Sequence, residues 1–127
     1  MNTDDHGELN QLSERVIGAA HQVSSVLGCG FLEKVYENAL AHELKRRGLL
    51  VEQQRRMAVR YRYEIVGEYF ADLVVNDRLI VELKTVKVFD PIHEAQCINY
   101  LRASGHRLCL LMNFARPRLL VRRIING

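Results

Sequence analysis

Residues 69–85, YFADLVVNDRLIVELKT, decide the fold, because they contain two apolar segments separated by a short turn. Val, Ile, Leu and aromatic residues dominate Tyr69–Val75 and Leu79–Thr85, a composition that predicts β-strands. The tripeptide NDR between them consists of residues that favour turns. The stretch therefore predicts an antiparallel hairpin, and its second strand is apolar on both faces, as expected of a covered central strand.

Three charged residues interrupt these apolar strands: Asp72 in the first, and Glu82 and Lys84 in the second. Side chains two residues apart in a strand point to the same face, so Glu82 and Lys84 share one face. If residues 76–78 all form the loop, Asp72 lies directly opposite Glu82. A two-residue loop would put the two carboxylates on opposite faces, so the loop length tests whether the three groups converge.

Two facing carboxylates repel each other, so either one of them holds a proton or a cation bridges them. Carboxylate oxygens are the ligands that Mg²⁺ and Mn²⁺ prefer. Lys84 beside such a metal can orient or deprotonate a water and stabilise charge that develops on a phosphate. The alternative is a structural ion pair of Lys84 with Asp72 or Glu82. We favour the functional site, because three ionisable groups converge in apolar strands.

Hydrophobic periodicity and turn residues divide the rest of the chain into helices and strands. We expect helices at about Glu8–Leu27, Phe31–Arg47 and Pro91–Ser104, and further strands at Met57–Tyr63, Arg107–Phe114 and Leu119–Ile125. The order is helix, helix, three strands, helix, two strands, which predicts an α/β sheet with helices on its faces. The length suits a single domain over residues 1–127.

The expected helix Pro91–Ser104 carries a polar residue on the side that should face the sheet. With Gln96 at the centre of that side, Asn99 and Tyr100 fall on the same face, and Tyr100 lies one turn from Gln96. An amide packed on a sheet needs hydrogen-bond partners. Gln96 is therefore either a structural amide bonded to backbone or a group that holds a metal-bound water or a phosphate.

The spacing of these residues resembles a known family. Ala71-Asp72, followed after nine residues by Glu82-Leu83-Lys84, resembles the D-x(n)-E-x-K signature of the PD-(D/E)XK nuclease superfamily, with Ala71 in place of the proline. Gln96–Tyr100 is similar to the QxxxY motif of its exonuclease-like branch, and GFLEKVY at residues 30–36 resembles the heading of the GxxExxY family assigned to that superfamily. The resemblance extends from about residue 10 to Ile125.

This resemblance implies a restriction-endonuclease-like αβββαβ core, here with an extra N-terminal helix and an extra C-terminal strand. It implies that Asp72, Glu82 and the Leu83 carbonyl bind the metal, Mg²⁺ or Mn²⁺, and that Lys84 is the catalytic lysine. Glu33, from the helix before the sheet, completes the acidic cluster in this family pattern. Helical periodicity alone does not select Glu33, which lies at the edge of the apolar face, whereas Glu43 lies nearer its middle.

The function expected from these observations is a metal-dependent phosphodiesterase that cleaves nucleic acid, with DNA as the expected substrate. A water on the Asp72/Glu82 metal attacks the phosphorus, Lys84 stabilises the transition state and Gln96 positions groups. A second hypothesis is a catalytically silent module that keeps the nuclease fold for binding nucleic acid or protein. A third is a structural ion-pair core in a small-ligand protein, which would bind no divalent metal.

The formal net charge of +3 is unevenly distributed: residues 1–52 hold eight acidic and five basic residues, and residues 53–127 hold seven and thirteen. Arg suits phosphate because its planar group can bond bidentately. The nucleic-acid contacts that we expect are Tyr100, Arg55, Arg56, Arg60 and Arg62, and Arg116, Arg118, Arg122 and Arg123 form a second basic cluster. For either arginine cluster taken singly, we slightly favour the alternative of a solvated face of an edge strand.

No apolar run is long enough for a membrane span, and the start MNTDDHGELN lacks the features of a signal peptide, so a cytoplasmic location is expected. Cys29, Cys97 and Cys109 are far apart in the sequence and have apolar neighbours, so we expect three buried free thiols. The apolar last strand is either a surface for homodimer formation or is covered by the N-terminal helix.

Overall fold

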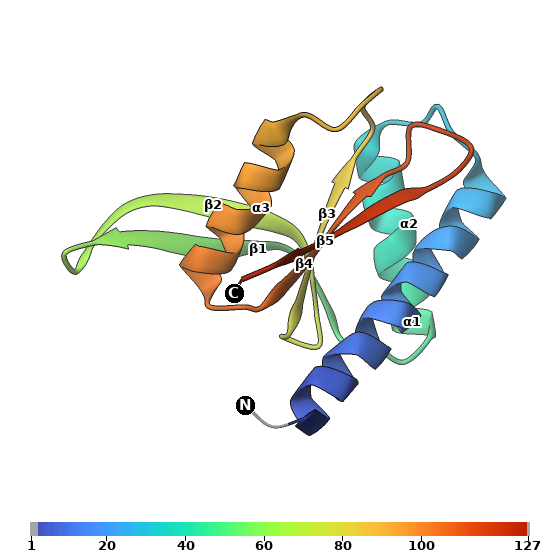
Figure 1. The fold of residues 1–127 in the computed structure, drawn as a ribbon. Helices are drawn as coiled ribbons and strands as arrows, with labels where there is room; N and C mark the ends of the chain where they lie inside the picture. The colour runs from blue at the N-terminus through green and yellow to red at the C-terminus, as the bar shows by residue number, and fades with distance from the viewer. Residues whose placement is uncertain (1–2, 127) are drawn as a thin grey trace.

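The computed structural model describes the backbone of residues 3–126 and the side chains of residues 7–126. Three helices and five strands follow one another in the predicted order (Figure 1). Their bounds are α1 Thr3–Leu27, α2 Glu33–Arg46, β1 Val51–Tyr61, β2 Glu64–Val75, β3 Leu79–Lys84, α3 Pro91–Ser104, β4 Leu108–Asn113 and β5 Leu120–Ile125. No helix within the described range is long and apolar enough to cross a membrane.

The five strands form one mixed sheet in the order β1-β2-β3-β4-β5. Neighbouring strands run antiparallel except β3 and β4, which are parallel and are joined through α3. A parallel pair requires such a crossover connection, and its helix covers one face of the sheet. The αβββαβ core with an added N-terminal helix and C-terminal strand is thus confirmed.

The turn between β2 and β3 has the predicted three-residue length. Val75 pairs with Leu79, and Val74 pairs with Ile80. The Arg78 N–H donates to the Val75 carbonyl at 3.0 Å, and Asn76 and Asp77 both adopt positive φ, at 52° and 53°. Asn and Asp tolerate this left-handed conformation better than other non-glycine residues, so the tripeptide closes the hairpin in the register that sets Asp72 against Glu82.

Side chains of the sheet alternate between two apolar cores. The core under α1 and α2 receives Leu73, Val75, Leu79, Val81, Leu83, Leu108, Leu110 and Met112 from the sheet. The core under α3 receives Ala71, Val74, Ile80, Cys109 and Leu111. A strand whose successive side chains enter opposite cores is apolar on both faces, which explains the continuous apolar run of β3.

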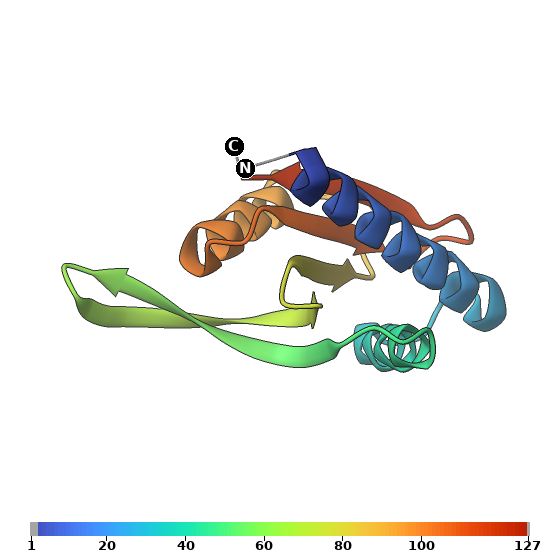
Figure 2. The same ribbon diagram turned by 90° about the horizontal axis from the view of Figure 1, so that it is seen from below.

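Strands β1 and β2 form a long twisted ribbon that extends beyond the rest of the sheet (Figures 1 and 2). The sequence predicted a strand to Tyr63 and another from Tyr69, but β2 already begins at Glu64. Arg62 and Tyr63 form the turn, with φ of 47° and 74°. Two positive-φ residues match the twist of a tight hairpin, and this turn was missed because it contains no Gly, Asn or Asp.

Candidate active site

The site forms where β2 and β3 part. Their pairing runs to Leu73 opposite Val81, and the next two residues, Asp72 and Glu82, place their side chains between the strands. The Asp72 N–H donates to Glu82 Oε1 at 3.1 Å, and the Leu83 N–H donates to Asp72 Oδ2 at 2.9 Å. Backbone groups that would otherwise lack a partner thus fix both carboxyl groups side by side.

The Glu82 side chain is almost completely buried, with 2% of its surface exposed. Burial and the neighbouring negative charge of Asp72 raise the pKa of Glu82 to about 10. Without a cation, therefore, Glu82 holds a proton at neutral pH. A positive charge brought beside the pair would favour the ionised form of Glu82.

Lys84 follows Glu82 on the same face of β3. Glu82 pairs with Leu111 and Lys84 with Asn113, and Leu111 belongs to the core under α3, so this face is the one that α3 covers. The Lys84 carbonyl accepts a hydrogen bond from the Phe114 N–H at 2.9 Å, which holds the end of the strand. Across residues 7–126, no carboxylate lies within 4 Å of the Lys84 ammonium, so the alternative of a structural ion pair is not observed.

Glu33 joins this group from the first turn of α2. Burial raises its pKa, and so does the negative charge of Asp72, whereas Lys84 lowers it. Glu43, the alternative from helical periodicity, instead accepts a hydrogen bond from Arg47 at 2.7 Å at the other end of the helix. The structure therefore brings Glu33, and not Glu43, to the Asp72–Lys84 end of the sheet.

The loop before α2 explains how Glu33 is held. Gly30 has a φ of +109°, a conformation that side chains rarely adopt. The Tyr36 hydroxyl donates to the Gly28 carbonyl at 2.7 Å and accepts from the Phe31 N–H at 3.2 Å. Its ring stacks on Phe114 with 4.9 Å between centroids. Within GFLEKVY, the glycine and the tyrosine thus shape the turn that presents the glutamate.

Two further polar residues contact the site and were missed in the sequence. Gln54 has a φ of 53° and its side-chain amide donates to Asp72 Oδ1 at 3.2 Å and to Glu37 Oε1 at 2.9 Å. The Glu37 carboxylate is buried, and its other oxygen accepts from Lys34 at 3.0 Å and from Gln53 at 2.9 Å. Strained backbone that is maintained by such contacts is common at functional sites. The available signal was the spacing of Glu33 and Glu37, one helical turn apart.

Helix α3 is rotated relative to the sequence prediction. Its buried residues are Cys97, Tyr100 and Leu101, so the face that packs on the sheet is displaced by roughly 90° from Gln96. Gln96 is half-buried and lines an open hollow together with Asn99. Placing it at the centre of the packed face was wrong, because burying Cys97 and Leu101 removes apolar surface from water while an amide would need partners there.

Tyr100 lies on the packed face of α3, beside Cys97 and Leu101. It is 5% exposed, and its ring meets Tyr69 edge-on at 5.2 Å. Burial and then the charges of Glu82 and Asp72 raise the pKa of its hydroxyl. Tyr100 therefore forms a wall of the site under α3.

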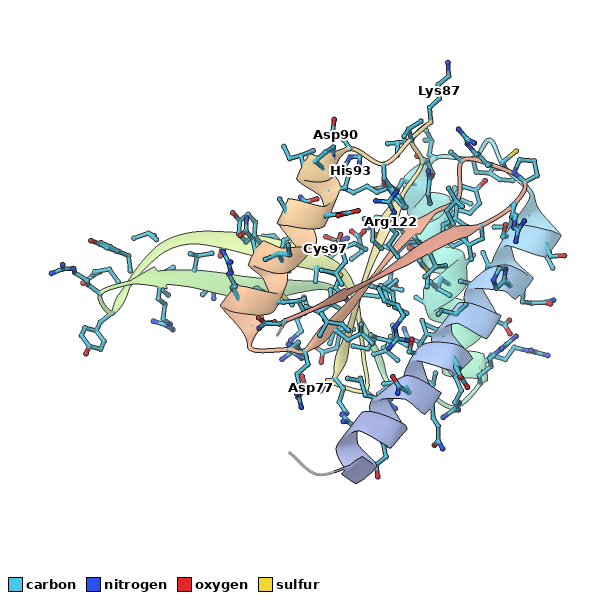
Figure 3. The ribbon with its side chains drawn as sticks, viewed as in Figure 1. Asp77, Lys87, Asp90, His93, Cys97 and Arg122 are labelled. Carbon is cyan, nitrogen blue, oxygen red and sulfur yellow. The ribbon has the colours of Figure 1, made fainter. Side chains whose placement is uncertain are left out.

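The cysteines follow the sequence prediction in part. Cys97, on the side of α3 toward the sheet (Figure 3), and Cys109 on β4 are buried free thiols in the same core. Cys29 is exposed, so its predicted burial was wrong, because it lies in the loop between α1 and α2 rather than in either helix.

The four arginines expected to hold nucleic acid fall into two groups, those that form ion pairs and those that do not. Arg55 forms an ion pair with Asp77, and Arg56 forms one with Glu68. Asp77 lies in the β2–β3 turn, at the end of the sheet opposite Lys87 and Asp90 (Figure 3), so the Arg55 guanidinium contacts that turn. Arg60 and Arg62 make no ion pair within residues 7–126. The sequence did not separate these two groups, because Asp77 and Glu68, which pair with Arg55 and Arg56, are distant in the chain.

The donor set suits a hard cation that keeps part of its water. In the portion with described side chains, no three His, Cys, Asp or Glu residues lie close enough together to hold a metal ion between them. Asp72 and Glu82 are adjacent, and the charge of Asp72 raises the pKa of a third carboxyl group, Glu33. This set suits Mg²⁺ or Mn²⁺, because Mg²⁺ is usually bound by one or two carboxylates and several waters. The residues present therefore fit a divalent cation at Asp72 and Glu82.

Comparison with known proteins identifies the superfamily and supports the fold. A profile of the PD-(D/E)XK nuclease superfamily, whose members generally use divalent metals, matches residues 10–124. The crystal structure of SSO0001 superposes with a TM-score of 0.57 at 17% identity, covering 74% of this chain and 50% of that chain, so this chain spans half its length. An alkaline exonuclease (LHK-Exo) from Laribacter hongkongensis gives a TM-score of 0.49 at 14% identity, covering 85% and 76%. A search of the curated proteins finds no significant match. On the profile match, the chain belongs to the PD-(D/E)XK nuclease superfamily.

Proposed function

We propose that this protein is a divalent-metal-dependent nuclease that hydrolyses phosphodiester bonds in DNA. The single observation that supports this most is the Lys84 ammonium, which has no carboxylate partner within the described side chains although it follows a buried, carboxyl-paired Glu82 on the same face. A positive charge left available beside an acidic pair is suited to a ligand that carries negative charge.

The residues that would hold the metal are Asp72 and Glu82, with the Leu83 carbonyl and Glu33 completing the set. A bound Mg²⁺ or Mn²⁺ would supply Lewis-acid polarisation of the phosphate and a water of lowered pKa. Asp72 is already fixed for this role by the Leu83 N–H and the Gln54 amide. Glu82 must first give up its proton, which ties metal binding to pH.

Each of the remaining site residues acts on the substrate in this proposal. The Lys84 ammonium holds the non-bridging oxygens and stabilises the charge that develops on them. Gln96, which faces the open hollow, orients the phosphate or the attacking water through its amide. Tyr100 excludes water from the face of the sheet that carries the carboxyl pair, since it is buried under α3.

Within the superfamily, we place the chain in the GxxExxY family as a single nuclease-like domain. The placement is supported by the roles of Gly30 and Tyr36 in the loop that presents Glu33. We also propose a homodimer through β5, which is the last strand of the sheet. One of its faces is occupied, because Arg123 donates to Ser13 and Asn10 of α1, but its outer edge is unpaired within the described residues.

A catalytically silent module is the second candidate, and the pKa of Glu82 is the observation that favours it. A carboxyl group that keeps its proton to about pH 10 weakens the attraction for a cation at neutral pH. Such a module would retain the fold and the nucleic-acid contacts without hydrolysis.

Cleavage and metal binding separate the two candidates. The protein is titrated with Mg²⁺ or Mn²⁺ while thermal unfolding is followed, and cleavage of single-stranded, duplex and branched DNA is then measured. Metal-dependent cleavage that is lost in both Asp72→Ala and Lys84→Ala supports the nuclease. A metal-induced rise in Tm with no cleavage of any substrate supports the silent module, and wild-type cleavage by Lys84→Ala contradicts the mechanism.

A further inference from the structure

The end of the β1–β2 ribbon projects into solvent, and we call residues 58–67 the outer ribbon (Figures 1 and 2). Its large side chains are exposed: Tyr63 is 96% exposed, Val66 62% and Tyr61 56%. An isolated two-stranded hairpin is at best marginally stable in water, and these side chains gain nothing from the core. The outer ribbon therefore has the character of a contact surface rather than of a structural element.

Three arginines, Arg60 and Arg62 of the outer ribbon and Arg102 of α3, outnumber the one exposed glutamate of the ribbon, Glu64, so this surface is net positive and favours a polyanion. Arg60 and Arg102, from the ribbon and from α3, line one open hollow of about 500 Å³, and no acidic residue lines it. Arg62 lies at the tip, and none of the three has a carboxylate within 4 Å among residues 7–126. Guanidinium groups that share a hollow without an acid favour an anion between them, and phosphate matches their planar geometry.

The shape of the outer ribbon is suited to the groove of a nucleic-acid double helix. Two antiparallel strands joined by the two-residue turn Arg62–Tyr63 make a narrow, twisted finger. The major groove of B-DNA is about 12 Å wide and admits a two-stranded ribbon, whereas the major groove of A-form RNA is too deep and narrow for side chains to read. We propose that the outer ribbon enters the major groove of duplex DNA, with Arg60, Arg62 and Arg102 on its phosphates. The proposal rests on the nuclease function and names its substrate as duplex DNA.

The tyrosines argue against a single-stranded ligand. A track for unpaired bases needs several uncovered aromatic rings in succession. The Arg62 guanidinium covers the Tyr61 ring at 5.6 Å from its centroid, and Tyr69 packs edge-on against Tyr100. Of the three ribbon tyrosines, Tyr63 alone has no ring or cation partner within the described side chains.

The hollow also connects the ribbon with the site. A second hollow, lined by Gln96, shares Tyr69 and Asn99 with the first. A sugar-phosphate backbone that lies between Arg60 and Arg102 can therefore continue along α3 to Gln96, on the face of the sheet that carries Glu82. The outer ribbon would orient a duplex so that one strand reaches the carboxyl pair.

The test is duplex binding as a function of salt, measured by fluorescence anisotropy with EDTA present so that no cleavage occurs. The variant is Arg60→Ala/Arg62→Ala, and the matched control is Lys45→Ala/Arg46→Ala, which removes the same charge from the exposed last turn of α2. Loss of two phosphate contacts should reduce the slope of log K against log salt by about 1.8, and weaken binding by about tenfold at moderate salt. The control should keep the wild-type slope.

Two results would overturn the inference: an unchanged slope and affinity in Arg60→Ala/Arg62→Ala, or preference of the wild type for single-stranded DNA or duplex RNA of the same sequence. Urea unfolding of the variant checks that it remains folded. Ribbon-dependent duplex binding without cleavage in Mg²⁺ or Mn²⁺ would support the inference while contradicting the nuclease. Cleavage of DNA by the wild type, together with undiminished duplex binding by Arg60→Ala/Arg62→Ala, would support the nuclease and contradict the inference.

Discussion

The β1–β2 ribbon has two halves that differ in what their polar side chains contact. In the inner half, the Gln54 amide bridges Glu37 and Asp72, and each of these bonds lies within the protein. In the outer half, Arg60 and Arg62 have no acidic partner among the described side chains. One pair of strands therefore does two things: its inner half fixes a buried acidic site, and its outer half leaves charge and apolar surface for a partner.

The largest effect is expected at the site itself, from Lys84→Ala. Removal of a group that stabilises transition-state charge should lower the rate of DNA cleavage by about 10²- to 10³-fold. The free energy of unfolding should change little, because Lys84 is only half-buried and makes no ion pair within residues 7–126. The measurement is cleavage rate at saturating metal, with urea unfolding of the same variant. A loss of stability that parallels the loss of rate would indicate a structural lysine.

Gln54→Ala should have the next largest effect, on metal affinity. Partners that orient a metal ligand typically contribute about 10- to 100-fold to affinity, and the Gln54 amide is 3.2 Å from Asp72 Oδ1. Titration calorimetry with Mn²⁺ measures the change without reference to cleavage.

Gln53→Ala is the matched control for this variant. Its amide bonds Glu37 and Asn38 at 2.9 Å but does not contact Asp72. It should therefore lower stability about as much as Gln54→Ala while leaving Mn²⁺ affinity nearly unchanged. Equal loss of affinity in both variants would show that Glu37, rather than the bond to Asp72, carries the effect.

The raised pKa of Glu82 predicts how the site responds to pH. Between the ordinary value of 4.5 and about 10, the folded protein without metal holds a proton that the unfolded chain has released. The contribution of Glu82 to stability is thus full below about pH 4.5 and is lost as pH rises toward 10. Because a cation must displace this proton, Mg²⁺ affinity should rise by about tenfold per pH unit within that window.

Glu82→Gln is the control variant for both pH dependences, that of stability and that of Mg²⁺ affinity. Its metal-free stability should be less dependent on pH across the same window, since the amide does not titrate. Calorimetry of the wild type in buffers of different ionisation enthalpy should show release of about one proton per cation near neutral pH. Metal binding without proton release would mean that Glu82 is ionised before the cation arrives.

The sequence correctly predicted the relative placement of Asp72, Glu82 and Lys84, because strand geometry alone determines it. Side chains in a strand alternate strictly, so a three-residue loop was sufficient to set Asp72 against Glu82 and to place Lys84 on the same face. The order and type of the elements followed in the same way from hydrophobic periodicity.

Contacts that depend on the approach of separate elements could not be predicted. Gln54 and Glu37 meet because α2 packs beside β1, a distance that no local pattern encodes. The predicted rotation of α3 was also wrong: Cys97 contributes a weak apolar signal, so the packed face was centred on Gln96 rather than near Cys97. The arginines also looked equivalent in sequence until their partners in the fold separated them.

The smallest effect is expected from a substitution in the outer ribbon, on the free energy of unfolding. This measurement tests the difference between the inner and outer halves of the ribbon most directly. Tyr63→Ala should change the free energy of unfolding by less than about 0.5 kcal/mol, because Tyr63 is 96% exposed and buries almost no surface on folding. Met57→Ala, on the same strand pair but 4% exposed, should cost about 2–3 kcal/mol through the cavity it leaves. Both values come from urea unfolding in the absence of DNA. A large cost for Tyr63→Ala would mean that the tip packs against the protein in solution, and the outer ribbon would then be structural rather than available to a duplex.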